Sequence, residues 1–375
     1  MRARRVALWV LLAGKLLGSW GLTWDIQWHL RIGRDSFWIA PHLMLYAGVT
    51  AGFVAAVTVL LLDTRAARRG APPPGTITAA GLTSTRGVHL AAWGMLLLLL
   101  AAPIDDLWHR LFGIDVTLWS PPHLLGLLGS AVNTIGTLLI AAEVYPPGHR
   151  ARLPALALGA GLLYGGVRVV LEPSWLTAYS HGGVAFHMFA MLGAILLPLA
   201  LVPAAQLLDR RWAPIGIVLV SLAVAAVGEQ IARAGFAILQ PVSVLDAAIR
   251  ADPTSSIAVA ATIREKTRGA GVPLPVRLLL PIVAAAVMGA VDVRRRRAAA
   301  CVAYGVAIFA LYGWSTSQSP AFPLPSPGET VTALAITVVA ALAGAALGGR
   351  LADALQRRRP RVGVPGGRVA TSPGR

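Results

Sequence analysis

The chain has 375 residues, of which 56% are hydrophobic and only 13% are charged, and its mean hydropathy is +0.68. A soluble domain carries about 25% charged residues, so this composition excludes an ordinary soluble protein. The formal net charge of +17 could suggest a nucleic-acid partner. However, the arginines lie between apolar stretches and in the tail, without interleaved aromatic residues. We therefore expect a membrane protein whose partner is the lipid bilayer, with no nucleic acid bound.

Ten apolar stretches that approach or reach the length needed to cross a hydrocarbon core recur along the chain. They are continuous rather than alternating, which predicts helices and argues against a β-barrel. The predicted fold class is all-α, a polytopic membrane helix bundle with about ten transmembrane helices. The predicted spans are residues 6–24, 42–62, 88–104, 123–142, 153–171, 184–207, 213–238, 276–292, 298–313 and 329–348.

The distribution of basic residues predicts the orientation of the bundle. About two thirds of the 33 Lys and Arg fall in segments that the helix count places on one side, and cytoplasmic loops carry such an excess. Both termini are therefore expected in the cytoplasm, with the bundle in the plasma (inner) membrane. The amino-terminal stretch is similar to a signal peptide but lacks an A-x-A cleavage site, so we expect a retained first helix.

These spans divide the chain into seven segments. They are a first helix–loop–helix repeat over 1–62, a Pro/Gly-rich cytoplasmic linker over 63–87, a second helix–loop–helix repeat over 88–142, further transmembrane helices over 143–239, an outer loop over 240–275, C-terminal transmembrane helices over 276–349 and a basic cytoplasmic tail over 350–375. Within the outer loop we expect a surface helix near 242–250.

The two repeats are defined by a shared pattern after the first and third spans. The first copy reads DIQWHLRIGRDSFWIAPHL from Asp25, and the second reads DDLWHRLFGIDVTLWSPPHL from Asp105. Many identical positions of mostly rare residue types, in a chain rich in Ala and Leu, indicate an internal duplication. The matched pairs are Asp25/Asp105, Trp28/Trp108, His29/His109, Gly33/Gly113, Asp35/Asp115, Trp38/Trp119, Pro41/Pro122, His42/His123 and Leu43/Leu124.

Each copy places three potential metal ligands close together on the outer face. Its Asp and first His are four residues apart, so they share one face if the span continues as a helix. A glycine then permits a turn and a proline opens the next helix, which returns the second His to the same end. The six predicted ligands are Asp25, His29, His42, Asp105, His109 and His123.

Helix-end electrostatics supports a metal at these positions. A carboxylate at the C-terminal end of a helix favours a nearby cation, and a histidine at an N-terminal end stays neutral and able to coordinate. Two imidazoles and one carboxylate suit iron, zinc or copper, with a coordination position left open. A single cysteine, Cys301, excludes a thiolate cluster. Secondary candidates are Asp35, Asp115, His181 and His187.

Polar residues at the ends of the spans and inside them can also have roles without a metal. Aromatic and polar side chains collect at membrane interfaces in many membrane proteins. Charged residues inside spans are candidates for function, although Glu229 and Arg233 are four apart and can neutralise each other. The remaining charges of this kind are Lys15 and Arg168.

The spacing of both sets resembles that of the C subunit of the particulate methane and ammonia monooxygenases, which are copper membrane enzymes. That subunit binds copper through Asp-x3-His-x12-His and carries a second set, Asn-x3-His-x13-His. The first set here matches the first spacing, and the second set matches the second, with Asp105 in place of the Asn. The resemblance covers roughly residues 6–210. It implies copper, oxidation of a small apolar substrate by dioxygen, and other oxygenase subunits as partners.

The predicted function is thus that of a copper-binding membrane protein similar to the monooxygenase C subunit, with catalytic activity undecided and zinc or iron as alternative metals. A metal transporter or metallochaperone is a second hypothesis, but it requires ligands through the bilayer, and the chain has only six Met. A third hypothesis is a non-catalytic structural subunit whose metal holds helix ends together.

Overall fold

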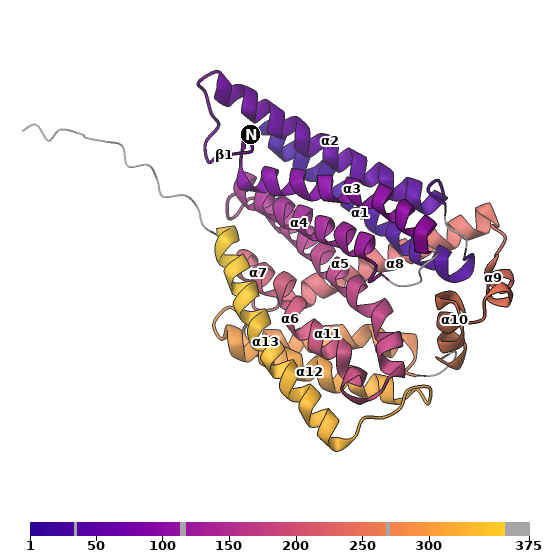
Figure 1. The fold of residues 1–375 in the computed structure, drawn as a ribbon. Helices are drawn as coiled ribbons and strands as arrows, with labels where there is room; N and C mark the ends of the chain where they lie inside the picture. Colours follow the sequence, from indigo (N-terminus) through magenta and orange to yellow (C-terminus); the bar gives the residue numbers. More distant parts are fainter. Residues whose placement is uncertain (34–35, 113–117, 268–270, 357–375) are drawn as a thin grey trace, which may run out of the picture.

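The protein is a bundle of long helices with one small β-hairpin (Figure 1). The computed structural model describes residues 1–33, 36–112, 118–267 and 271–356. Ten helical segments in these ranges are long and apolar enough to cross a membrane. The prediction of an all-α bundle with about ten helices of membrane-spanning length and composition is thereby confirmed.

The membrane-length helices agree with the predicted spans but extend beyond them at most ends. They are α1 (Arg2–Arg31), α2 (Ala40–Arg68), α3 (Arg86–Phe112), α4 (Pro121–Val144), α5 (Arg152–Ser180), the segment of η1 (Gly183–His187), α6 (Met188–Leu196) and α7 (Pro198–Leu208), α8 (Ala213–Leu239), α11 (Leu274–Val291), α12 (Arg297–Ser317) and α13 (Pro327–Gln356).

Three segments between the spans differ from the sequence-based description. The predicted linker contains the end of α2 and a hairpin of β1 (Ile77–Ala79) and β2 (Leu82–Ser84), which pair antiparallel. The outer loop holds the expected short helix, α9 (Leu245–Ala251), and also α10 (Ser256–Thr267). The tail begins inside α13, and its residues 357–375 lie outside the described ranges.

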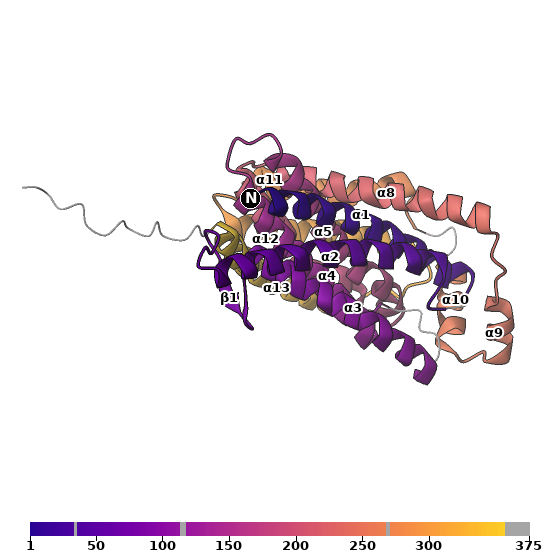
Figure 2. The same cartoon turned by 90° about the horizontal axis from the view of Figure 1, so that it is seen from above.

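Two groups of helices form the bundle. Helices α1 to α4 pack as two hairpins, α1 with α2 and α3 with α4, and α5 and α8 lie against them. Helices α6, α7, α11, α12 and α13 make the second group, which α5 and α8 join to the first. The β-hairpin and the N-terminus lie at one end of the bundle and α9 and α10 at the other (Figure 2).

A buried ion pair joins the elements at the β-hairpin end. The Arg4 guanidinium on α1 donates to Asp63 Oδ2 on α2, with Nη2 at 2.8 Å and Nε at 3.2 Å. The hydroxyl of Ser84 on β2 donates to the same oxygen. Separating a buried pair would leave an uncompensated charge, which is costly. These contacts therefore hold the hairpin and the start of α1 in place against α2.

At the opposite end, the chain after α1 turns at Gly33, which has a φ of +74°. Only glycine adopts this backbone region without strain, and an added Cβ would also meet Leu245 of α9. The Val244 N–H donates to the Ile32 carbonyl at 2.8 Å, so the outer loop is fastened to the end of α1.

Glycines let the two helices of each hairpin touch through their backbones. A Cβ added at Gly94 of α3 would lie 2.4 Å from the Asn133 nitrogen and 2.7 Å from the Gly129 oxygen, both on α4. A Cβ added at Gly14 of α1 would lie 2.5 Å from the Gly48 oxygen of α2. Small residues of this kind allow close helix packing in membranes, where van der Waals contact drives association.

We therefore expect Gly94→Ala to destabilise the protein, because the new methyl group meets backbone atoms that cannot move aside. Overpacking of this kind costs about 1–3 kcal/mol. Thermal unfolding of the purified protein should show a lower midpoint. Gly216→Ala on α8 is the matched control, since a Cβ there meets nothing within 4 Å. A midpoint for Gly94→Ala equal to that of the control would contradict the close packing.

Candidate metal centre

All six predicted ligands lie at one end of the α1–α4 group. Asp25 and His29 are on α1, and His42 is in the first turn of α2. The second set repeats this arrangement, with Asp105 and His109 on α3 and His123 in the first turn of α4. A proline occupies the first or second position of both α2 and α4, as the sequence predicted.

The second set brings its three side chains to one point. Asp105 Oδ2 lies 3.6 Å from His109 Nε2, and Asp105 Oδ1 lies 3.2 Å from His123 Nε2. One ligand atom from each residue lies within 4.8 Å of the other two. Among the described residues, this is the one cluster of three or more His, Cys, Asp or Glu with such spacing.

The first set is assembled around one carboxylate oxygen. Asp25 Oδ1 lies 3.1 Å from His42 Nε2 and 3.5 Å from His29 Nδ1. That same His29 Nδ1 is 2.9 Å from the Asp25 carbonyl oxygen, which can only accept, so Nδ1 carries the proton. In the neutral ring the lone pair is then on Nε2, on the side of the imidazole away from Nδ1.

The two sets are neighbours in space. The His29 and His109 rings have centroids 6.4 Å apart and are inclined by 26°. Within each set the two imidazole centroids are 6.3 Å and 6.0 Å apart. Side chains of the six residues are between 11% and 22% exposed, so they are largely shielded from solvent. The arrangement is one continuous cluster of two carboxylates and four imidazoles.

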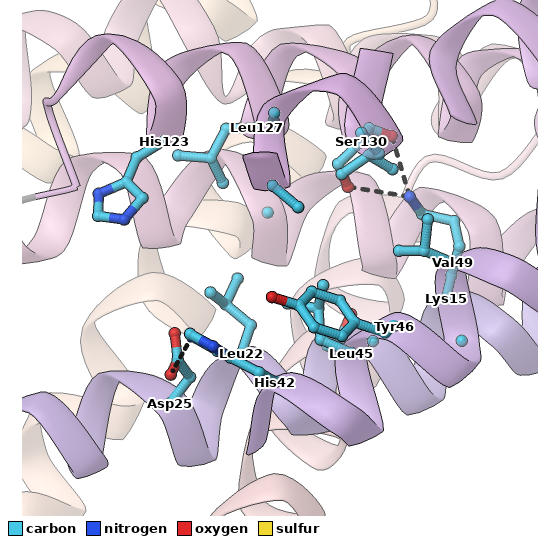
Figure 3. Close-up of a pocket in the computed structure, with 18 of the residues that line it drawn as sticks. Lys15, Leu22, Asp25, His42, Leu45, Tyr46, Val49, His123, Leu127 and Ser130 are labelled. Carbon is cyan, nitrogen blue, oxygen red and sulfur yellow. Dashed lines mark hydrogen bonds and ion pairs between the residues drawn. The ribbon is translucent and has the colours of Figure 1, made fainter. Parts of the chain in front are cut away.

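A cavity of about 180 Å³ opens beside this cluster and continues between the hairpins. One end of this cavity is lined by Asp25, His42, Asp105 and His123. Figure 3 shows Asp25 and His42 facing His123 across this space, with Leu22, Leu45 and Leu127 beyond them. Most of the remaining lining is also apolar or glycine, so a small apolar molecule fits its character.

The position of the two aspartates within their helices differs from the prediction. They were expected at the C-terminal ends, but α1 continues to Arg31 and α3 to Phe112. These extensions place each carboxylate nearly two turns inside its helix. Because the helix dipole acts mainly within the last turn, it contributes less to these carboxylates than expected. The neighbouring imidazoles, rather than the helix end, are the polar groups that lie next to each carboxylate.

The secondary candidates do not join the cluster in the described structure. Asp35 and Asp115 lie outside the described residues. His181 is exposed just after α5. His187 is buried and stacks on Phe309 of α12, with ring centroids 4.0 Å apart. Neither of its ring nitrogens has a hydrogen-bond partner among the described residues, so its contacts there are those of an aromatic packing residue.

Two lining residues were not predicted as part of the site. Tyr46 follows His42 by one helical turn, and their rings are 5.8 Å apart. The spacing of four residues on α2 could have indicated this contact. Ser130 was not signalled by the sequence, because only the packing of α4 against α1 brings it to the cavity.

The expected pair of Glu229 and Arg233 is present, at 3.5 Å.

Comparison of the chain with protein-family models, with curated proteins and with solved structures finds no match.

We expect His187→Leu to leave the midpoint of thermal unfolding within a few degrees of the wild type. The change is between side chains of similar size and removes a buried ring whose nitrogens have no partner, so the lost stacking is partly offset. Circular dichroism during heating provides the measurement. A large loss of stability would contradict this expectation and show that the stacking on Phe309 contributes more than the unpartnered nitrogens cost.

Proposed function

We propose that this chain is a copper-binding integral membrane protein, with the metal held by the two Asp-His-His sets. The observation that carries the proposal is the convergence of Asp105, His109 and His123, whose ligand atoms lie within 4.8 Å of one another. Two neutral imidazoles and a carboxylate form a donor set that suits copper, zinc or iron.

The spacing of the second set fits an ion at its centre. Ligand atoms that are each about 2.0–2.2 Å from a tetrahedral ion lie about 3.4 Å from one another. The two carboxylate–imidazole separations, 3.2 Å to Oδ1 and 3.6 Å to Oδ2 of Asp105, are close to this value, and one ligand atom from each residue lies within 4.8 Å of the others. Three protein ligands would leave one position for water or another small molecule, and two of these ligands, Asp105 and His123, also line the cavity.

The first set is less ready to receive an ion. His42 and the Asp25 carboxylate are in contact, but His29 turns its protonated Nδ1 toward them. Coordination by this imidazole through Nε2 requires a change in ring orientation. We therefore expect the second set to bind metal more tightly than the first.

Copper is favoured over zinc and iron by the resemblance of both spacings to the monooxygenase C subunit. Bound copper would supply redox chemistry with dioxygen. In this chain the imidazoles and carboxylates would hold the ion, and the apolar cavity lining would place a small hydrophobic substrate beside it and exclude water. Other oxygenase subunits are the partners that the same resemblance implies.

The orientation of the bundle and its origin are part of this proposal. We place both termini in the cytoplasm of a cell with an inner membrane and the six ligands on the outer side, because the excess of Lys and Arg lies in the opposite loops. The matched geometry of the α1–α2 and α3–α4 hairpins supports an internal duplication.

The direct test is the metal content of the purified protein, measured by elemental analysis after loading with copper, zinc or iron and removal of unbound ions. We expect stoichiometric copper in the wild type. His109→Ala should lower the affinity of the tighter site at least tenfold, since it removes one of three ligands. His29→Ala should affect the weaker site, and the double variant should lose both.

His149→Ala is the matched control, because His149 stacks on Tyr145 near the β-hairpin end of the bundle and touches neither set. It should retain the copper of the wild type. The proposal fails if wild-type protein holds no stoichiometric metal, and a double variant that keeps its copper would refute these ligands. Stoichiometric zinc or iron in place of copper would support these residues as a metal site but contradict the assignment of copper.

A further inference from the structure

A buried lysine lies at the far end of the cavity that adjoins the two sets. Lys15 is in the middle of α1 and only 8% exposed. Its Nζ donates to the Ser130 carbonyl oxygen and to the Ser130 hydroxyl, both at 2.9 Å. No carboxylate among the described residues forms an ion pair with it.

This environment leaves the ammonium group incompletely compensated. An ammonium has three N–H donors, and the two contacts with Ser130 are to uncharged oxygens. A charged group inside a membrane-spanning helix is costly and normally has an opposite charge nearby. Two other basic residues of the long helices follow this rule, since Arg4 pairs with Asp63 and Arg233 pairs with Glu229.

The cavity connects this lysine with the Asp-His-His sets. Lys15 and Ser130 line one end, and Asp25, His42 and His123 line the other. Figure 3 shows the Lys15–Ser130 pair on one side of the view and these three residues on the opposite side. Lys15 precedes Asp25 by ten residues of one helix, which corresponds to about 15 Å along its axis. The wall between the two ends includes Leu22, Leu45 and Leu127.

We propose that this cavity binds an elongated apolar molecule with a carboxylate head, of the size of a medium-chain fatty acid such as octanoate. The carboxylate accepts from the Lys15 ammonium, and a charge-assisted hydrogen bond of this kind is about twice as strong as a neutral one. The hydrocarbon chain lies along the leucines, and its methyl end reaches the Asp-His-His sets. As a statement about the substrate of the metal centre, this inference rests on the proposed function, whereas carboxylate binding at Lys15 can be tested without it.

The experiment uses the full chain in lipid nanodiscs and a photoreactive probe, an octanoate analogue with a diazirine next to its methyl end. We expect crosslinks, mapped by mass spectrometry, at the cluster end of the cavity, on residues such as Leu22 and Tyr46. Octanoate should suppress the labelling and octylamine should not. In Lys15→Met the labelling should fall at least tenfold, and Lys15→Arg, which keeps the charge, should retain most of it.

Arg110→Met is the matched control, since it removes an exposed cation that is paired with Asp106; it should label as the wild type does. If Lys15→Met does not fold, Leu127→Trp blocks the cavity while leaving the lysine in place, and it should abolish the labelling. Equal labelling of Lys15→Met and wild type, equal competition by octylamine, or full labelling of Leu127→Trp would overturn the inference.

Metal content measured on the same samples separates the two proposals. Labelling that depends on Lys15 in a chain without stoichiometric metal would support the carboxylate site and reject the metal function. Stoichiometric metal without such labelling would reject the carboxylate site alone.

Discussion

The close packing of two helix hairpins is the constraint on which the candidate site depends. Each set takes two ligands from one helix and the third from the next, so its geometry is fixed only if the paired helices approach within backbone contact. Gly14 and Gly94 provide that approach, because a Cβ at either position would collide with the partner helix. Larger residues there would separate the helices and move His42 and His123 away from their carboxylates.

Charge in an apolar surrounding is the second constraint. In the described structure, the carboxylate of Asp63 is paired with a guanidinium, and the carboxylate of each Asp-His-His set has imidazoles beside it. Carboxylates held in this way retain little access to water, and a metal ion would compensate them more fully than neutral rings do. Lys15 forms no ion pair with a carboxylate of the described residues, and it lies in the same cavity as the sets. Oppositely charged groups thus stand at the two ends of one apolar space.

Much of the fold and of the candidate site could be predicted from the sequence. The ten long helices follow from apolar length alone, since a helix is the structure that satisfies its own backbone in lipid. The ligand spacing predicted that Asp105 and His109 share a helix face and that His123 returns at the start of the next helix. The sequence could not predict that α1 and α3 continue past their aspartates, because no local signal ended the helices where hydropathy fell. It also offered no reason to expect the β-hairpin in the Pro/Gly-rich segment after α2.

The sequence by itself therefore determined the class of the protein, the number of long helices and the composition of each Asp-His-His set. These are local properties, set by hydropathy and by residue spacing along one or two helices. Only the tertiary structure decided that the two sets are neighbours, with His29 beside His109, and that Lys15 and Ser130 share a cavity with them. Such contacts join residues far apart in the chain, and they depend on how the hairpins pack, which no pattern within a single segment encodes.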